Sequence, residues 1–292
     1  MKYAAIDIGS NAVRLMIIQA MGDGKNTYFK KVSLVRVPLR LGHDAFTSGK
    51  ITPHNITSLI KTLQAFKNLM EVHKVKHTMA CATSALREAR NGKTVVATLR
   101  RRTGINVQIV SGQREAEILY GTHIAEKLGK NRSFLYIDIG GGSTELTVFT
   151  KGKRTDSASF NLGTIRILEG REPSETWQAL KDWLQIARKK LKGNVIGIGT
   201  GGNVTKLYRL SKLKKDQLLT YPRIRDLLDE LEMYTVAERM HHFSLNPDRA
   251  DVIVPAAKIL LWVMKWARVK DLHVPNVGLV DGMVGLMHDR FK

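Results

Sequence analysis

Short apolar runs alternate with longer amphipathic segments along the chain, and this alternation predicts an α/β protein. The short runs predict strands near 28–37, 77–83, 106–111, 155–160, 195–199 and 271–274. The amphipathic segments predict helices near 53–72, 92–103, 113–128, 163–170, 174–192, 203–211, 222–231, 233–242, 250–268 and 278–290.

Two stretches repeat one pattern, KYAAIDIGSNAVRLMIIQ from residue 2 and FLYIDIGGGSTELTVFT from residue 134. Each is an apolar strand that reaches an aspartate, Asp7 or Asp138, then a Gly/Ser turn, then a second β-rich run. Each copy therefore predicts a β-hairpin with its turn at the glycines. A pattern repeated once predicts two related domains, which we place at 1–127 and 128–292.

The composition indicates which binding partners and which cellular compartment to expect. With 47 Lys and Arg against 26 Asp and Glu, the net charge is +21, which favours polyanionic partners and salt-sensitive, non-specific nucleic-acid binding. The single cysteine, Cys81, excludes an internal disulfide and lies in an apolar run, where we expect an inert core thiol. We expect a cytoplasmic protein without a membrane segment, because no apolar run is long enough to span a bilayer. The sequence is compatible with a homodimer and with a monomer.

Four glycine- or hydroxyl-rich stretches follow predicted strands, where α/β proteins bind ligands: DIGSNAVRL (7–15), ATSALREARN (82–91), DIGGGSTE (138–145) and GIGTGGNV (197–204). Glycine turns, hydroxyls and helix N-termini offer the N–H and O–H donors that a phosphate group needs. Asp138 and Glu145 would repel a phosphate unless a hard cation lies between them, so we expect Mg²⁺, or Mn²⁺, at these two carboxylates. Asp7 is the equivalent acid of the first copy.

Glu115, in SGQREAEILYGT (111–122), is the candidate catalytic acid–base group. On this stretch alone the alternative is structural, because Ser111 can cap a helix whose first turns favour acids. Arg87 could clamp a phosphate through two hydrogen bonds, or could be a surface arginine, and Arg40 leaves the same two options. The chain contains no P-loop motif, no G-x-G-x-x-G after the first strand and no paired zinc-ligand motif.

The sequence resembles the Ppx/GppA family of exopolyphosphatases and guanosine pentaphosphate phosphohydrolases over nearly its whole length. The resemblance rests on DIGSNAVRL, ATSALREARN, SGQREAEILYG, DIGGGSTEL, GTGGN and RADVIVPAAKIL, in that order. It implies two ribonuclease-H-like domains of the actin-like, sugar kinase and chaperone ATPase superfamily around a central cleft. Long members carry further C-terminal helical domains, including an HD-type one, and this sequence is similar to the short form.

The resemblance also implies roles for individual residues. Glu115 matches the family's general base, and Asp138 and Glu145 match its metal-linked acids, with Asp7 as a further candidate. The residues we expect to bind substrate phosphates are Ser10, Asn11, Arg14, Arg40, Thr83, Ser84, Arg87, Gly141, Gly142, Ser143, Gly201 and Gly202.

These observations lead to the expectation of a metal-dependent exopolyphosphatase that releases terminal orthophosphate from inorganic polyphosphate by in-line attack of water. A guanosine pentaphosphate 5′-phosphohydrolase is the close alternative, because both substrates end in a phosphoanhydride. A non-catalytic sensor of alarmone nucleotides is the alternative from another class. A small-molecule kinase is a fourth option, for which the sequence shows no acceptor feature.

Overall fold

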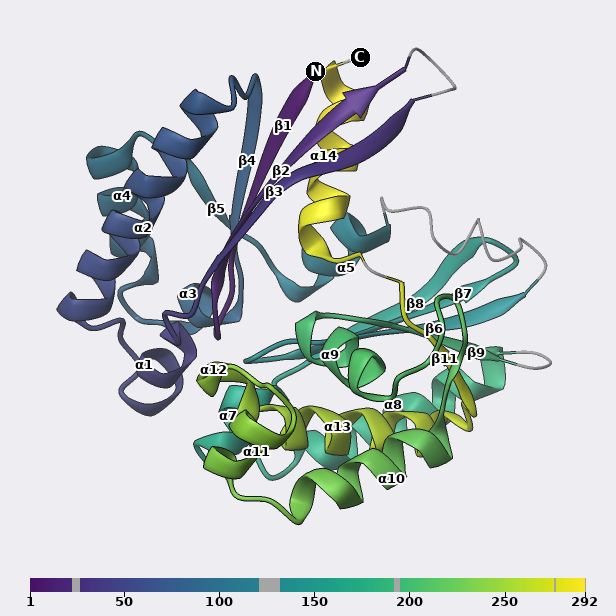
Figure 1. Cartoon of the computed structure of the whole chain (residues 1–292). Helices are drawn as coiled ribbons and strands as arrows, with labels where there is room; N and C mark the ends of the chain where they lie inside the picture. The colour runs from purple at the N-terminus through teal and green to yellow at the C-terminus, as the bar shows by residue number, and fades with distance from the viewer. Residues whose placement is uncertain (23–26, 121–131, 192–194, 276, 292) are drawn as a thin grey trace. The chain divides into compact units, whose positions relative to one another are not determined.

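The computed structural model describes residues 1–22, 27–120, 132–191, 195–275 and 277–291, except for the side chain of residue 120. Contacts divide the chain into two compact units, residues 1–122 together with 279–292, and residues 123–278 (Figure 1). Both units are α/β, as the alternation of apolar and amphipathic segments predicted.

The first unit is built on a five-stranded sheet in the order β3-β2-β1-β4-β5 (Figure 1). β1 (Lys2–Ile8), β2 (Val13–Met21) and β3 (Tyr28–Val37) pair antiparallel in sequence. β4 (His77–Ala82) lies parallel to β1, and β5 (Val107–Ile109) lies parallel to β4. The carboxyl ends of β1 and β4 therefore lie together, which brings the loops after them to one edge of the sheet.

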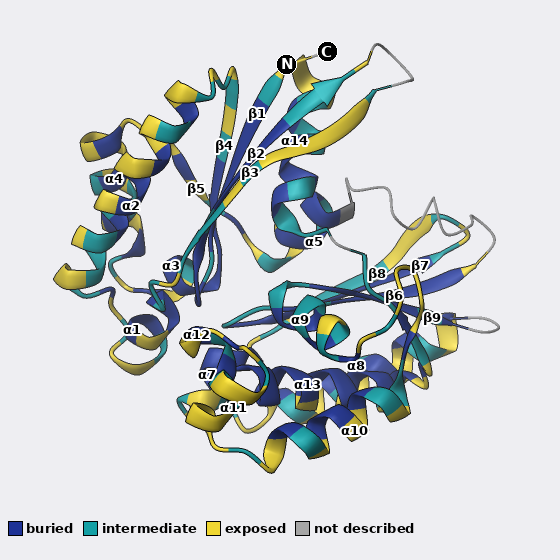
Figure 2. Cartoon of the chain, viewed as in Figure 1, coloured by how far each residue is buried: buried dark blue, intermediate teal, exposed yellow. Residues whose placement is uncertain are grey.

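Helices cover both faces of this sheet. They are α1 (Leu41–Thr47), α2 (Pro53–Val72), α3 (Ser84–Glu88), α4 (Gly92–Thr103), α5 (Gly112–Tyr120) and α14 (Leu279–Phe291). Ile6 and Ile8 of β1 share one core with α2 and α4, whereas Tyr3 and Ala5 point to the other face and pack with α5 and α14. Strand alternation explains this division, and Figure 2 shows β1 buried along most of its length.

The C-terminal helix corrects our division of the sequence, which assigned 279–292 to the second domain. α14 packs against β1, β4 and α5 and so belongs to the first unit. Its Gly282 lies so close to α5 that an added Cβ would clash with the carbonyl oxygen of Ile118. The expected boundary between residues 127 and 128 lies outside the described residues.

The second unit repeats this plan on a six-stranded sheet in the order β10-β11-β9-β6-β7-β8. Its strands are β6 (Ser133–Ile139), β7 (Thr144–Thr150), β8 (Lys153–Phe160), β9 (Ile196–Thr200), β10 (Leu219–Thr220) and β11 (Asp271–His273). Its helices are α7 (Thr164–Leu168), α8 (Thr176–Lys190), α9 (Gly202–Leu210), α10 (Tyr221–Glu232), α11 (Val236–His242), α12 (Pro247–Ala250) and α13 (Ile253–Ala267).

The predicted repeat is confirmed at the level of topology. β6, β7 and β8 form an antiparallel meander like β1, β2 and β3, and β9 lies parallel to β6 as β4 lies parallel to β1. Alternate residues of β6, Leu135, Ile137 and Ile139, pack into the core with α8, α9, α10 and α13, which puts Asp138 on the opposite face. Within the described residues, none of the helices combines the length and the apolar character needed to cross a membrane.

Candidate active site

The hairpin turns of the two units are built alike. The Gly9 N–H donates to the carbonyl oxygen of Ala12 at 3.1 Å, and the Gly140 N–H donates to that of Ser143 at 2.9 Å. In both units, the segment that follows the third strand hydrogen-bonds to this turn. The N–H of Arg40 donates to Asn11 O at 3.0 Å, and the N–H of Thr164 donates to Gly140 O at 3.1 Å. The repeat therefore includes the support of the turn as well as the hairpin.

In the second unit, every carbonyl group of the three glycines is engaged by the start of α7. Gly140 O accepts from Thr164 N, Gly141 O accepts from Ile165 N at 2.8 Å, and Gly142 O accepts from Nε of Arg166 at 2.9 Å. The N–H groups of residues 141–143, by contrast, donate to no acceptor within the part of the chain that is described. A turn whose carbonyls are tied down and whose amides remain available suits an anion.

Close packing makes glycine necessary at the base of this turn. Gly163 has an extended backbone (φ −138°), which any residue could adopt. A Cβ at this position, however, would lie 2.5 Å from the carbonyl carbon and oxygen of Gly141 and would also clash with Gly142. Gly163 is thus the residue that allows α7 to begin directly beneath the loop.

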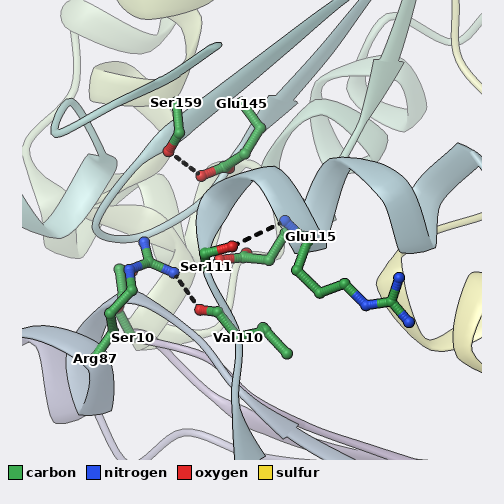
Figure 3. A network of polar contacts seen from close by, with 9 residues as sticks. Ser10, Arg87, Val110, Ser111, Glu115, Glu145 and Ser159 are labelled. Carbon is green, nitrogen blue, oxygen red and sulfur yellow. Dashed lines mark hydrogen bonds and ion pairs between the residues drawn. The ribbon is translucent and has the colours of Figure 1, made fainter. Parts of the chain in front are cut away.

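A row of oxygen-bearing side chains crosses the second sheet beside this loop. Asp138 pairs in register with Glu145 on β7 and with Thr200 on β9, so the three side chains lie on one face. Glu145 is 4% exposed, and its Oε1 accepts a hydrogen bond from Ser159 Oγ at 3.0 Å (Figure 3). Asp138 and Glu145, the two carboxylates at which we expect one cation, are therefore direct neighbours in the sheet.

The donor set of this row fits a hard divalent cation, because carboxylate and hydroxyl oxygens are the ligands that Mg²⁺ and Mn²⁺ prefer. The described residues contain no group of three or more His, Cys, Asp or Glu side chains that could hold a metal ion. Asp138 and Glu145 are only two, and Mg²⁺ is commonly held by one or two carboxylates with substrate phosphates and water.

The equivalent row in the first unit carries a different pair. Asp7 stands opposite Arg14 in the register, and Arg14 Nη1 lies 2.6 Å from Asp7 Oδ2. Arg14 therefore occupies the place that Glu145 has in the second unit. The carboxylate that we predicted as a further metal ligand is held in an ion pair here, and Arg14, predicted to contact substrate, is its partner.

The candidate base and the candidate phosphate clamp are partners in the first unit. Arg87 Nη1 lies 2.6 Å from Glu115 Oε1 and donates to the carbonyl oxygen of Val110 at 2.8 Å (Figure 3). Ser111 caps the helix, with its Oγ accepting from Arg114 N at 3.1 Å. The capping interpretation of this stretch is thus correct for Ser111, while Glu115, 7% exposed, extends its side chain to Arg87.

Of the remaining predicted residues of the first unit, Ser10, Thr83 and Ser84 lie just after β1 and β4, and Arg40 follows β3. Ser10 Oγ and Ser84 Oγ are 2.8 Å apart and both are buried. Thr83 is joined to β1 through its N–H, which donates to Ile8 O at 3.1 Å. Arg40 begins α1 in the left-handed conformation (φ 52°), which is uncommon outside glycine and asparagine.

The loop after β9 carries Gly201 and Gly202, and it shows why neither has a side chain. A Cβ on Gly201 would lie 2.8 Å from Oδ1 of Asp138, and one on Gly202 would lie 2.5 Å from the guanidinium of Arg249. Arg249 is fixed there by a 2.7 Å hydrogen bond from its Nη1 to Oδ1 of Asn203. Burial, and then the charges of Arg209 and Arg249, lower the pKa of the nearby Lys206 ammonium.

Sequence reasoning missed three residues that the structure brings to these loops: Arg166, Thr200 and Arg249. Arg249 begins the RADVIVPAAKIL motif, so a signal for it was present. Arg166 follows the glycine of GTIRIL by three residues, and its contact with Gly142 depends on folding between distant segments. Nothing in the local sequence indicates that contact.

The burial of Cys81 and the charges near it decide whether its thiol is reactive. It lies opposite Asp7 in the sheet and is 1% exposed. Burial first, and then the carboxylates of Asp7 and Glu115, raise the pKa of the Cys81 thiol to about 11, against an opposing contribution from Arg114. The raised pKa keeps the thiol protonated at pH 8, which agrees with the expected inert core thiol.

We therefore expect iodoacetamide to leave Cys81 unmodified in the folded protein at pH 8 and to modify it fully in denaturant. Mass spectrometry of the intact chain measures both. Rapid modification of the folded protein at pH 8 would contradict both the burial and the direction of the pKa shift.

Comparisons with known proteins find similar sequences and similar folds. The model of the Ppx/GppA phosphatase family matches residues 17–291. Exopolyphosphatase 1 of Mycobacterium tuberculosis is 26% identical over 306 residues, which cover 97% of this chain and 87% of that protein. A crystal structure of the Aquifex aeolicus member of the Ppx/GppA family, 26% identical, aligns with a TM-score of 0.77 over 99% of this chain and 98% of that one.

An exopolyphosphatase from Cytophaga hutchinsonii aligns with a TM-score of 0.83 at 24% identity, over 100% of this chain and 99% of that one. At this identity the alignment bears on the fold alone. Together with the Aquifex aeolicus structure it confirms the predicted actin-like architecture of two α/β units.

Proposed function

Because the chain belongs to the Ppx/GppA phosphatase family, we propose that it is an exopolyphosphatase that releases orthophosphate from the end of inorganic polyphosphate. The observation that carries this proposal is the loop at 140–143. All three glycine carbonyls there are held by α7 and Arg166, whereas the amides of residues 141–143 have no acceptor among the described residues and could donate to a phosphate group. The name of the Mycobacterium tuberculosis relative supports the choice of substrate.

In this proposal the amides of the 140–143 loop bind the oxygens of the terminal phosphate. Arg87 and the hydroxyls of Ser10 and Ser84 serve as further donors. Fixed donors of this kind favour a phosphoryl group whose charge is spread over its oxygens during transfer, without reorganisation at the moment of reaction. Gly201 and Gly202 would contribute to phosphate binding through their backbone, because the absence of side chains leaves space for the substrate beside Asp138 and Arg249.

Asp138 and Glu145 would hold the divalent cation. When bound, the cation would offset the negative charge of the phosphate oxygens. Ser159 fixes Glu145 through its hydrogen bond, which leaves the carboxylate in one orientation. The binding of a cation at these two carboxylates is itself a part of the proposal.

Glu115 is the proposed general base. It would orient a water molecule and accept its proton as the water oxygen attacks the terminal phosphorus, while the bond from phosphorus to the bridging oxygen breaks and the shortened chain leaves. Arg87, which contacts Glu115 in this structure, would orient the carboxylate and would also reach substrate oxygens.

The test is phosphate release from tripolyphosphate, long-chain polyphosphate and guanosine pentaphosphate, each with Mg²⁺ and with EDTA. We expect the largest kcat/KM for a polyphosphate, and EDTA should lower the rate at least about 100-fold, since a cation that contributes several kcal/mol is removed. Restoring Mg²⁺ in excess of the EDTA is the control for irreversible damage.

Two outcomes would replace this assignment. A larger kcat/KM for guanosine pentaphosphate would make the chain a 5′-phosphohydrolase that uses the same residues. Tight nucleotide binding without release of phosphate from any substrate would make it a sensor.

A further inference from the structure

Thr200 is a buried polar residue to which the proposed reaction, as described above, gives no role. It ends β9, it is 1% exposed, and its Oγ1 has no hydrogen-bond partner among the described residues. A buried hydroxyl without a partner costs about 1–3 kcal/mol, so such a group in a folded protein calls for a reason.

Thr200 lies next to the two acidic residues of the candidate cation site. It is the register neighbour of Asp138 on one side, as Glu145 is on the other, so its side chain lies on the same face as the two carboxylates. The Asp138 carboxylate is directed toward β9, since its Oδ1 lies 2.8 Å from the place of a Cβ on Gly201, the residue after Thr200. Thr200 thus lies beside the acidic pair, on the adjacent strand and on the same face of the sheet.

We propose that Thr200 supplies the third protein oxygen of the cation site, from its hydroxyl, directly or by holding a coordinated water. The inference deepens the proposed function, because it rests on a divalent cation at Asp138 and Glu145. Hydroxyl oxygen is a hard ligand of the kind that Mg²⁺ and Mn²⁺ accept. The cation or its water would give Thr200 Oγ1 the partner that the described residues do not provide.

The test measures binding of Mn²⁺ alone, without substrate, by electron paramagnetic resonance, in which the signal of the free ion reports the bound fraction. Thr200→Val removes the hydroxyl and keeps the branched shape, and we expect it to weaken Mn²⁺ binding at least about 10-fold, as loss of an ion-orienting group does. Thr200→Ser keeps the oxygen and should bind Mn²⁺ within about 3-fold of the parent, well short of the loss expected for a removed ligand.

Thr150→Val is the matched control. Thr150 lies at the opposite end of β7 from Glu145, and its Oγ1 likewise has no partner within the described chain. The substitution removes the same atom from the same unit, so its Mn²⁺ affinity should equal that of the parent.

Thermal unfolding separates a ligand role from a structural one. Without metal, Thr200→Val should melt no lower than the parent, since the valine removes an unsatisfied buried hydroxyl. Added Mn²⁺ should then raise the melting temperature of the parent more than that of the variant, because ligand that binds only the folded state stabilises it according to its affinity.

Each outcome decides the matter. Equal Mn²⁺ affinity of Thr200→Val and the parent would overturn the role of Thr200 and leave the cation site intact. Absence of Mn²⁺ binding by the parent would overturn the cation site and this inference together, whereas the substrate panel tests hydrolysis separately.

Discussion

Glu115→Gln should lower the rate of phosphate release by about 10²- to 10⁴-fold, the range over which a positioned general base contributes. The substitution keeps the size of the side chain and an amide oxygen that can still accept from Arg87, which contacts Glu115 Oε1 at 2.6 Å. It removes the ability to take a proton from water. The loss should therefore appear in kcat, with KM for polyphosphate changed by less than about 3-fold, because uniform binding is retained.

Glu117→Gln is the matched control for this prediction. Glu117 lies on the same helix, two residues further on, and pairs with Arg114 at 3.0 Å on a partly exposed surface. Exposed pairs of this kind contribute little to stability, and Glu117 has no place in the proposed chemistry. Its substitution should leave kcat within about 2-fold of the parent, since exposed substitutions rarely perturb a folded protein. A Glu115→Gln variant as active as Glu117→Gln would remove Glu115 from the mechanism.

The arrangement of the two hairpins could be predicted from sequence because it is a local property. A short turn between two strands fixes their register, and in each copy the residue seven positions after the aspartate stands opposite it. This places Glu145 against Asp138 and, by the same rule, Arg14 against Asp7. The sequence prediction used the rule for the first pair and gave Asp7 and Arg14 separate roles, which their ion pair now joins.

The features that escaped prediction depend on segments that are distant in sequence. α14 has an apolar face that could have packed on either sheet, and its packing against β1, β4 and α5 assigns it to the first unit. Arg166 is an ordinary arginine by local pattern, and its place beside Gly142 arises when α7 packs under the loop. Arg249 opens a recognisable motif, but its place beside Gly202 also depends on segments that are distant in sequence. The short elements α1, α12 and β10 carry too few residues to show a period.

Gly163→Ala tests whether the shape of the 140–143 loop carries the activity. The added methyl group would lie 2.5 Å from the carbonyl carbon and oxygen of Gly141. These neighbours are backbone atoms of a loop that α7 holds by hydrogen bonds, so they can yield only if the loop or α7 moves. Such overpacking should lower the free energy of unfolding by about 1–3 kcal/mol, measured by urea denaturation.

The effect of Gly163→Ala on activity should exceed what its stability predicts. In the proposed site, the amides of residues 141–143 would bind a phosphate only while the carbonyls of the glycines stay bound to α7 and Arg166. Loss of one preorganised donor costs about 10²-fold or more in kcat. Gly278→Ala is the control, because a Cβ at this position meets no atom of the described residues within 4 Å. We expect Gly278→Ala to retain the rate and the unfolding midpoint of the parent. A folded Gly163→Ala variant with parental kcat would mean that the reacting phosphate does not depend on this loop, and the assignment of Gly141, Gly142 and Ser143 as its ligands would fall with that result.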